Sequence, residues 1–417
     1  MKGLPPRRQG AKNPQCFFIF LGVLVPSRLF FYLIILFLSS CSEHGSKREH
    51  LRSTDNFYPV LRASDSLPLV VRRLDTLFKT KVGKGFNGNV LIAQKGKVIY
   101  RCSFGWTDRK KNKKLSLNDR FQIASTTKTF TSAAILRLYA QKKLSLSDRV
   151  EKYVKNFPYR GITIRMLLSH RSGLPEYNYC SEEYFADHDK PVNMDSMISM
   201  ICTKAPGIYH KPGKKFDYCN TNYILLAKII ETVSGMKYAD LLEKEIFIPL
   251  GMNDTWVFDP GDSTLPELLK GHDTKWGLKK NNFLDGCVGD KGIYSTVNDL
   301  LLFDQALYGK ALLPDSLKKL AFEPGSKEFK GVYNYGLGWR ILRTDDDLPV
   351  VYHNGWWHGF NSCFYRRLAD STTIILLGNK FSKETYRIYG ILGILDNKQS
   401  SDDKEIGEED TEKKEDH

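Results

Sequence analysis

The stretch Phe121-Gln-Ile-Ala-Ser125-Thr-Thr-Lys128-Thr-Phe-Thr-Ser-Ala-Ala-Ile-Leu-Arg-Leu-Tyr139-Ala140 decides how this chain of 417 residues folds. A short strand-like run enters it, and the residues after Lys128 are apolar on nearly every side. A helix that is apolar all round is normally buried at the centre of a domain. We therefore expect a buried helix with Ser125 just before or at its first turn.

Ser125 and Lys128 are three residues apart, so both side chains point the same way, one turn apart. A hydroxyl at a helix N-terminus feels the positive end of the macrodipole, which favours an oxyanion. A lysine beside it in a low-dielectric cleft loses part of its preference for the charged form and can accept the serine proton. The pattern predicts a nucleophilic serine. The spacing alone is weak, since it recurs at Ser234/Lys237, Ser316/Lys319 and Ser401/Lys404.

The composition is that of a globular protein, with 41% hydrophobic and 26% charged residues, and the length suits one large domain or two intimate ones. The formal net charge of +15 indicates either a solvated basic surface or residence beside anionic polymers or lipid head groups. The densest basic cluster, Arg109–Lys114, resembles a hairpin tip. No aromatic-basic module accompanies it, so we expect no nucleic-acid partner.

The first 40 residues have the order of a secretory signal: basic Arg28, an apolar run to Leu38, then two serines before Cys41. Leu38-Ser-Ser-Cys41 resembles the lipobox of bacterial lipoproteins, in which the cysteine is lipidated. We therefore expect an exported protein anchored by lipid on Cys41, at the outer membrane or periplasmic face if the source is a diderm bacterium. The alternative is an N-terminal transmembrane anchor over residues 16–38.

The remaining pattern predicts four parts: a polar linker over 41–65, a folded domain over 66–398, a mostly helical section inside it at about 121–285, and a disordered tail over 399–417 with nine acids. Strand patterns precede the helical section and several follow it. The predicted fold class is α/β of the α+β type: an antiparallel sheet flanked by helices, with an inserted helical subdomain.

Metal and disulfide patterns are missing from the sequence. The six cysteines after Cys41 form no Cys-x-x-Cys or zinc-like spacing, and the nine histidines form no paired motif. The sequence assigns no disulfide pairing, and we expect no metal site and no cofactor.

Two further motifs follow the serine in chain order, Tyr218-Cys-Asn220 in a loop and His353-Asn-Gly355 in a strand. Together with Ser125-Thr-Thr-Lys128 they resemble the three signature motifs of the serine β-lactamase and D,D-peptidase superfamily, in its class C-like branch. The resemblance runs from about Asn87 to Lys380 and implies a β-lactamase/transpeptidase-like fold.

The resemblance also implies roles for these residues. Ser125 is the expected nucleophile, Lys128 its proton partner, and Tyr218 the general base, stabilised as an anion by Lys128 and His353. Asn220 is expected to bind Lys128 or the substrate amide. Substrate would contact Asn354, Gly355 and Trp356, and the backbone N–H groups of Ser125 and Trp356 would form the oxyanion hole.

Two departures from the family pattern concern the substrate. The third motif is His-Asn-Gly where many β-lactamases have Lys-Thr-Gly, and a neutral imidazole binds a carboxylate less strongly than a lysine does. Trp356-Trp357 follows where small residues are common, so an indole either lines the acyl pocket or packs away from it. Cys219 is interpreted as a small filler rather than a second nucleophile.

The sequence thus predicts an exported, membrane-tethered serine hydrolase that cleaves an amide or ester through a Ser125 acyl-enzyme. The expected substrate is a small molecule or a short peptide or ester, with cell-wall peptide as one candidate; peptidase, β-lactamase and esterase stay open. The alternative is a penicillin-binding sensor that acylates without turnover, or a degenerate binding domain.

Overall fold

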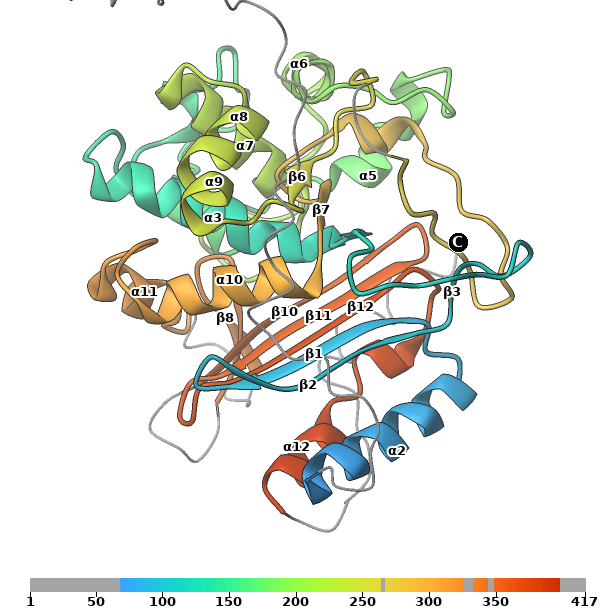
Figure 1. Cartoon of the computed structure of the whole chain (residues 1–417). Helices are drawn as coiled ribbons and strands as arrows, with labels where there is room; N and C mark the ends of the chain where they lie inside the picture. The colour runs from blue at the N-terminus through green and yellow to red at the C-terminus, as the bar shows by residue number, and fades with distance from the viewer. Residues whose placement is uncertain (1–67, 264–266, 326–332, 344–348, 398–417) are drawn as a thin grey trace, which may run out of the picture. The chain divides into compact units, whose positions relative to one another are not determined.

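The computed structural model describes residues 68–263, 267–325, 333–343 and 349–397. The main feature is a seven-stranded antiparallel sheet of order β2-β1-β12-β11-β10-β9-β8 (Figure 1). Its strands are β1 (Gly88–Gln94), β2 (Lys97–Phe104), β8 (Tyr333–Tyr335), β9 (Arg340–Leu342), β10 (Val350–Trp357), β11 (Phe360–Arg367) and β12 (Thr372–Gly378). The predicted signal, linker and tail, with Cys41, lie outside the described residues.

The N-terminal hairpin joins the C-terminal strands in this sheet. Lys95 and Gly96 at its turn have φ of 51° and 74°, the positive values that a two-residue primed turn requires. β1 then pairs with β12 from Gly88↔Gly378 to Gln94↔Thr372. The first strand therefore lies inside the sheet, between β2 and the last strand, β12.

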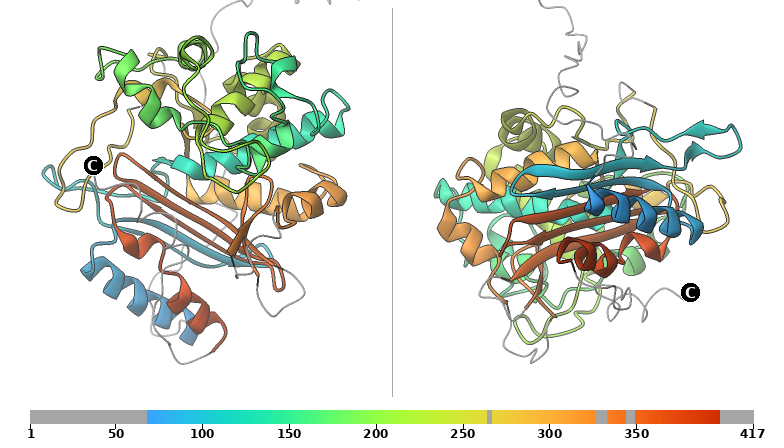
Figure 2. Two further views of the ribbon diagram at one scale, coloured as in Figure 1. Left: turned by 180° about the vertical axis from the view of Figure 1, so that it is seen from behind. Right: turned by 60° about the horizontal axis from the view of Figure 1, so that its bottom comes forward.

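Helices cover both faces of the sheet. On one face α3 (Thr127–Ala140) and α10 (Val297–Tyr308) share a core with Leu91 and Ile375. On the other face α2 (Leu69–Gly83) and α12 (Tyr389–Leu395) share a core with the neighbouring residues of the same strands, among them Ile92 and Leu376. Because side chains alternate along a strand, β1 and β12 serve both layers (Figures 1 and 2).

The section between β2 and β7 carries most of the helices, and three short strands of the order β5-β7-β6 run through it. The three strands are β5 (Phe121–Gln122), β6 (Trp256–Val257) and β7 (Ile293–Ser295). Besides α3, the helices of this section are α4 (Ile164–Leu168), α5 (Tyr177–Cys180), α6 (Met194–Lys204), α7 (Thr221–Ser234), α8 (Tyr238–Leu242) and α9 (Ile248–Leu250). A π-helical turn, η4 (Glu243–Phe247), joins α8 to α9. The predicted fold class is confirmed.

The remaining elements lie around this frame. They are the hairpin β3 (Trp106–Asp108) and β4 (Lys113–Lys114), the helix α11 (Asp315–Ala321) and the turns η1 (Ala124–Thr126), η2 (Val150–Lys152), η3 (Glu182–Tyr184), η5 (Phe283–Gly286) and η6 (Lys383–Thr385). The sequence pattern predicts one helix over 383–395, whereas the structure splits that stretch into η6 and α12.

Candidate active site

Ser125 lies in the turn η1 that leads from β5 into α3, half-buried beside β10 and β11. The residue before it, Ala124, has φ of 46°, a left-handed conformation that few non-glycine residues adopt. The turn is fixed from β11, because the Ser362 hydroxyl donates to the carbonyl of Ile123 at 2.7 Å. The serine therefore sits on a sharp, well-anchored bend directly before a buried helix.

Lys128 is fully buried, and three oxygens surround its Nζ. Nζ lies 3.0 Å from Ser125 Oγ, 2.7 Å from Asn220 Oδ1 and 3.0 Å from the carbonyl oxygen of Asp290. An amide oxygen and a carbonyl can only accept, so each takes an N–H of the lysine. The third direction of Nζ faces Ser125, which suits either an ammonium that donates to Oγ or an amine that accepts the hydroxyl proton.

Asn220 is itself held from behind by a buried carboxyl. Its backbone N–H donates to Glu176 Oε2 at 2.6 Å, at the start of α7. Burial raises the pKa of Glu176, and this hydrogen bond offsets only part of the rise. Glu176 thus fixes the position of Asn220, whose amide oxygen contacts Lys128.

Asp290 connects Lys128 to a second buried cation. The Tyr177 hydroxyl donates to Asp290 Oδ2 at 3.0 Å, and Lys291 Nζ lies 3.2 Å from the same oxygen. Lys291 also contacts the Tyr177 hydroxyl. These contacts hold the Asp290 backbone carbonyl in place under Lys128.

Tyr218 lies on the loop before α7 and is half-buried. Its ring centroid is 5.0 Å from Lys128 Nζ and 5.3 Å from the Arg340 guanidinium carbon, so two cations flank it. His170 stacks on the same ring at 4.3 Å. His170 Nδ1 accepts from the Cys219 N–H at 3.0 Å, and burial lowers the pKa of this histidine well below its ordinary value. A neutral imidazole therefore forms one wall around Tyr218.

The His353 ring centroid lies 6.4 Å from the Tyr218 ring centroid, and the two nitrogens of His353 are hydrogen-bonded to other groups. Nδ1 lies 2.7 Å from the Asn354 carbonyl, so Nδ1 carries the proton and Nε2 accepts from the Tyr335 hydroxyl at 3.1 Å. Burial and then the charge of Arg340 lower the pKa of His353 well below its ordinary value. Both nitrogens are thus engaged away from Tyr218, and the second cation at the tyrosine is Arg340.

Gly355 brings β10 against the serine turn. A Cβ at this position would lie 2.5 Å from the Ile123 carbonyl and 2.9 Å from the Ser125 backbone nitrogen. Such contacts are too short for any side chain, so glycine is the residue that this approach permits. The expected oxyanion hole requires this proximity of the Ser125 and Trp356 backbones.

The two tryptophans after Gly355 face opposite ways along the strand. Trp356 is 39% exposed and packs edge-on against Phe381 at 5.8 Å. Trp357 shares the face of Gly355, where its Nε1–H donates to Asp285 at 2.7 Å and Lys291 Nζ lies 4.4 Å from its ring. The indole linked to the lysine network is therefore Trp357 rather than Trp356.

The structure brings Ser125, Lys128, Asn220, Tyr218 and His353 to one place, as the three motifs suggest. The residues that sequence reasoning did not single out are His170, Glu176, Asp290, Lys291 and Arg340. His170 and Asp290 stand in stretches with clustered glycines or breakers, which were the available signals. Arg340 gives no such signal, because only the pairing of β9 with β10 brings it to the site.

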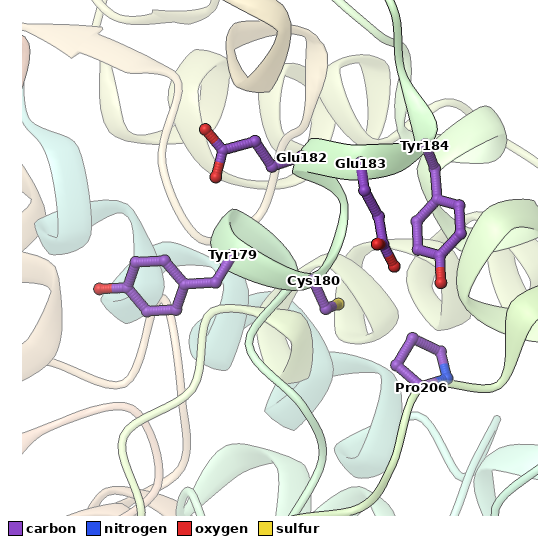
Figure 3. A pocket seen from close by; sticks show the side chains of 6 residues that line it. All are labelled: Tyr179, Cys180, Glu182, Glu183, Tyr184 and Pro206. Atoms are coloured by element: carbon purple, nitrogen blue, oxygen red, sulfur yellow. The ribbon is translucent and has the colours of Figure 1, made fainter. Parts of the chain in front are cut away.

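A separate surface pocket of about 330 Å³ lies at α5 and η3, lined by Tyr179, Cys180, Glu182, Glu183, Tyr184 and Pro206. Figure 3 shows Glu183 and Tyr184 extending toward Pro206, while Tyr179 points away. Burial, and next the charge of Glu176, raise the pKa of Cys180 to about 11, so its thiol is protonated at neutral pH. Cys219 is 3% exposed, and burial raises its pKa well above the ordinary value, as suits a packing residue.

Two negative findings concern only the described part of the chain. No helix there is both long and apolar enough to span a bilayer. No group of three or more histidine, cysteine, aspartate or glutamate side chains there is arranged to hold a metal ion.

Residues 74–396 match the Beta-lactamase family model. The chain belongs to the β-lactamase family. It is 34% identical over 336 residues to Penicillin-binding protein 4* of Bacillus subtilis, covering 76% of this chain and 73% of that protein. It is 28% identical over 326 residues to Protein flp of Staphylococcus aureus, covering 74% of this chain but only 62% of that longer protein.

Solved structures agree on this β-lactamase-family fold. The penicillin binding protein from Bacillus halodurans overlays with a TM-score of 0.67 at 23% identity, over 77% of this chain and 98% of that one. The D-amino acid amidase from Ochrobactrum anthropi gives 0.65 at 22% identity, over 78% and 98%. The protein is thus a serine hydrolase of the β-lactamase and penicillin-binding type.

Proposed function

We propose that this family member hydrolyses an amide or ester bond through an acyl-enzyme on Ser125. The observation that carries the proposal is the 3.0 Å contact between Lys128 Nζ and Ser125 Oγ, with Nζ fixed by Asn220 and Asp290 on its other sides. A nucleophile, an adjacent base and groups that orient the base are the parts that acyl transfer requires.

The proposed sequence begins when Ser125 Oγ attacks the carbonyl carbon and its proton passes to Lys128. The tetrahedral oxyanion is held by the backbone N–H groups of Ser125 and Trp356. The bond to the leaving group breaks as the Tyr218 hydroxyl gives that group its proton, and the charge of Lys128 stabilises the resulting phenolate. Water then attacks the acyl ester as the Tyr218 phenolate takes its proton, the acid is released, and Lys128 returns the first proton to Ser125 Oγ.

Arg340 suggests which substrates suit this site. Its guanidinium lies 5.3 Å from the Tyr218 ring and supplies the positive charge that neutral His353 lacks. Arginine pairs with a carboxylate through two parallel hydrogen bonds. We therefore favour amides with a carboxylate near the scissile bond, such as the C-terminal residue of a short peptide, and the name of the relative Penicillin-binding protein 4* supports this class.

The central experiment is labelling by a serine-directed fluorophosphonate. Ser125→Ala should abolish labelling, because the nucleophile is lost. Ser316→Ala is a matched control at another Ser-x-x-Lys spacing, exposed on α11, and should label like the wild type. Equal labelling of Ser125→Ala and wild type would refute the proposal, and an adduct that persists for hours would favour a non-turnover sensor.

The role of Arg340 is tested with a D-Ala-D-Ala peptide and its C-terminal amide. Arg340→Gln should raise KM for the free acid at least tenfold and change KM for the amide less than threefold, because only the acid carries the carboxylate. An equal rise in KM for both peptides would refute the role of Arg340 in carboxylate recognition, but it would not refute the hydrolase proposal.

We also propose that the protein is exported and anchored by lipid on Cys41, with a transmembrane segment over residues 16–38 as the alternative. The support is the order of basic, apolar and small residues before Cys41. Mass spectrometry of membrane-extracted protein should find a diacylglyceryl group on an N-terminal Cys41. An intact unmodified N-terminus would support the transmembrane anchor instead.

A further inference from the structure

Positive charge is concentrated on one surface beside the active-site strand. It is formed by the β3–β4 hairpin and by the loop over residues 270–280, which lie side by side (Figures 1 and 2). The two segments expose nine basic side chains against two acids, Asp108 and Asp273. We call this the basic surface, and its cations are Arg109, Lys110, Lys111, Lys113, Lys114, Lys270, Lys275, Lys279 and Lys280.

The two segments are fixed against each other by polar and aromatic contacts. Asn379 Nδ2 donates to the carbonyl of Trp106 at 3.4 Å and to that of Lys270 at 3.2 Å. The Trp106 and Trp276 rings lie 6.4 Å apart, and the Arg109 guanidinium carbon is 5.9 Å from each ring. The two segments of the basic surface are therefore held in a defined arrangement, and the tryptophan rings position some of its cations.

Asp108 and Asp273 offset only part of the positive charge of this surface. None of the nine forms an ion pair with a described carboxylate, although ion pairs occur at many other places. Burial and then the charge of Arg109 lower the pKa of the neighbouring Lys380. Nine like charges with only two carboxylates among them repel one another, and an anionic ligand relieves that repulsion.

The basic surface is continuous with the site. The Phe381 N–H donates to the His272 carbonyl at 2.8 Å, inside the loop that carries Trp276. The Phe381 ring contacts Trp356, which follows Gly355 at the serine turn. A chain bound along the basic surface could therefore reach Ser125 past the exposed Trp356.

We propose that the basic surface binds a linear polyanion that carries the ester or amide group which Ser125 attacks. This substrate class rests on the proposed hydrolase function. A chain in solvent fits better than a bilayer, because Trp106 and Trp276 are half-buried and covered by cations rather than free to insert. The repeating unit is defined here by its charge, as phosphate or carboxylate.

The test measures binding of long-chain inorganic polyphosphate to the full chain with Ser125→Ala, so that binding is independent of catalysis. Lys110→Gln/Lys113→Gln/Lys280→Gln removes three exposed charges and leaves the tryptophans intact. Affinity at low salt should fall at least tenfold, and the slope of log K against log salt should fall by about 2. The control Lys142→Gln/Lys143→Gln/Lys155→Gln removes three exposed charges elsewhere and should stay within twofold.

A second measurement links the surface to the site. With Ser125 present, polyphosphate should slow fluorophosphonate labelling, and the Lys110/Lys113/Lys280 variant should lose this protection while labelling normally without polyphosphate. The proposal would be overturned if the Lys110/Lys113/Lys280 variant and the control variant lost equal affinity for polyphosphate, or if the protein did not bind polyphosphate. Phosphatidylglycerol vesicles or an oligonucleotide bound more tightly than polyphosphate would overturn it in favour of a membrane or nucleic-acid partner.

Discussion

At the scale of single residues, the closest approach in the site is that of Gly355 to the serine turn. Gly355→Ala places a methyl group 2.5 Å from both the Ile123 carbonyl and Ser362 Oγ, and neither can withdraw freely because they are bonded to each other. We expect β10 to shift away from Ser125 and fluorophosphonate labelling to slow at least a hundredfold, as when an oxyanion donor is lost.

Gly207→Ala is the matched control for this substitution, since no atom lies within 4 Å of the new methyl group. It should leave the labelling rate and the thermal midpoint within error of the wild type. Wild-type labelling by Gly355→Ala would show that the separation of β10 and η1 does not set reactivity.

Single residues of the site differ in whether the sequence could predict them. Ser125 and Lys128 could be found because one helical turn places them together, and Tyr218 and His353 because they belong to recognisable motifs. Arg340 could not, since its position beside Tyr218 depends on the pairing of Arg340 with Tyr352 and Tyr335 across three strands. The hydrogen bonds that turn His353 away from Tyr218 likewise depend on Tyr335, which no local pattern connects to it.

At the scale of elements, periodicity predicted the strands and most helices, but not which strands are neighbours. The run Val90–Ala93 is apolar throughout, and the structure buries both of its faces between two helical layers. Its pairing with β12 joins two strands that are separated in sequence by nearly the whole domain, and local propensity does not specify such a pairing. The split of the last helix into η6 and α12 could not be predicted, because it depends on burial in the folded chain: the polar turn η6 buries Glu384 and Thr385, whereas α12 buries an apolar face.

In helix α10, burial and the helix dipole have opposite effects on the pKa of Asp299. Asp299 lies in its first turn, where the macrodipole favours a carboxylate by about 0.3–1 kcal/mol. Asp299 is only 2% exposed, and burial raises its pKa to about 7 despite the hydrogen bond from Thr255. A rise of this size corresponds to about 4 kcal/mol, so burial dominates.

The folded state therefore holds a proton on Asp299 between about pH 4 and 7, where the unfolded chain has released it. The free energy of unfolding from this group is full at low pH and is lost as the pH rises through about 7. Asp299→Asn should flatten that decline in urea unfolding measured at pH 5, 6 and 7.5, while exposed Asp240→Asn should keep the wild-type slope. An unchanged slope in Asp299→Asn would assign the decline to other groups.

At the scale of the whole molecule, two cores share one sheet, and two buried ion pairs join elements around it. Arg366 of β11 pairs with Asp304 of α10, and Lys81 of α2 pairs with Glu384 of η6, all four side chains being buried. Removing one partner of such a pair leaves an uncompensated buried charge, which costs about 3–5 kcal/mol. These pairs hold α10 to β11 and α2 to η6. Because both cores also include side chains of β1 and β12, we expect the two layers to unfold together.

The free cysteines make this cooperativity measurable. Cys219 lies in the core shared with α3, and Cys363 in the core shared with α2 and α12. Both are buried thiols with raised pKa, so alkylation requires unfolding. In increasing urea, mass spectrometry should find both alkylated at one rate, while half-buried Cys102 on the edge strand β2 reacts earlier. Alkylation of Cys363 before Cys219 would instead mean that the layer of α2 and α12 opens by itself, as a separate folding unit.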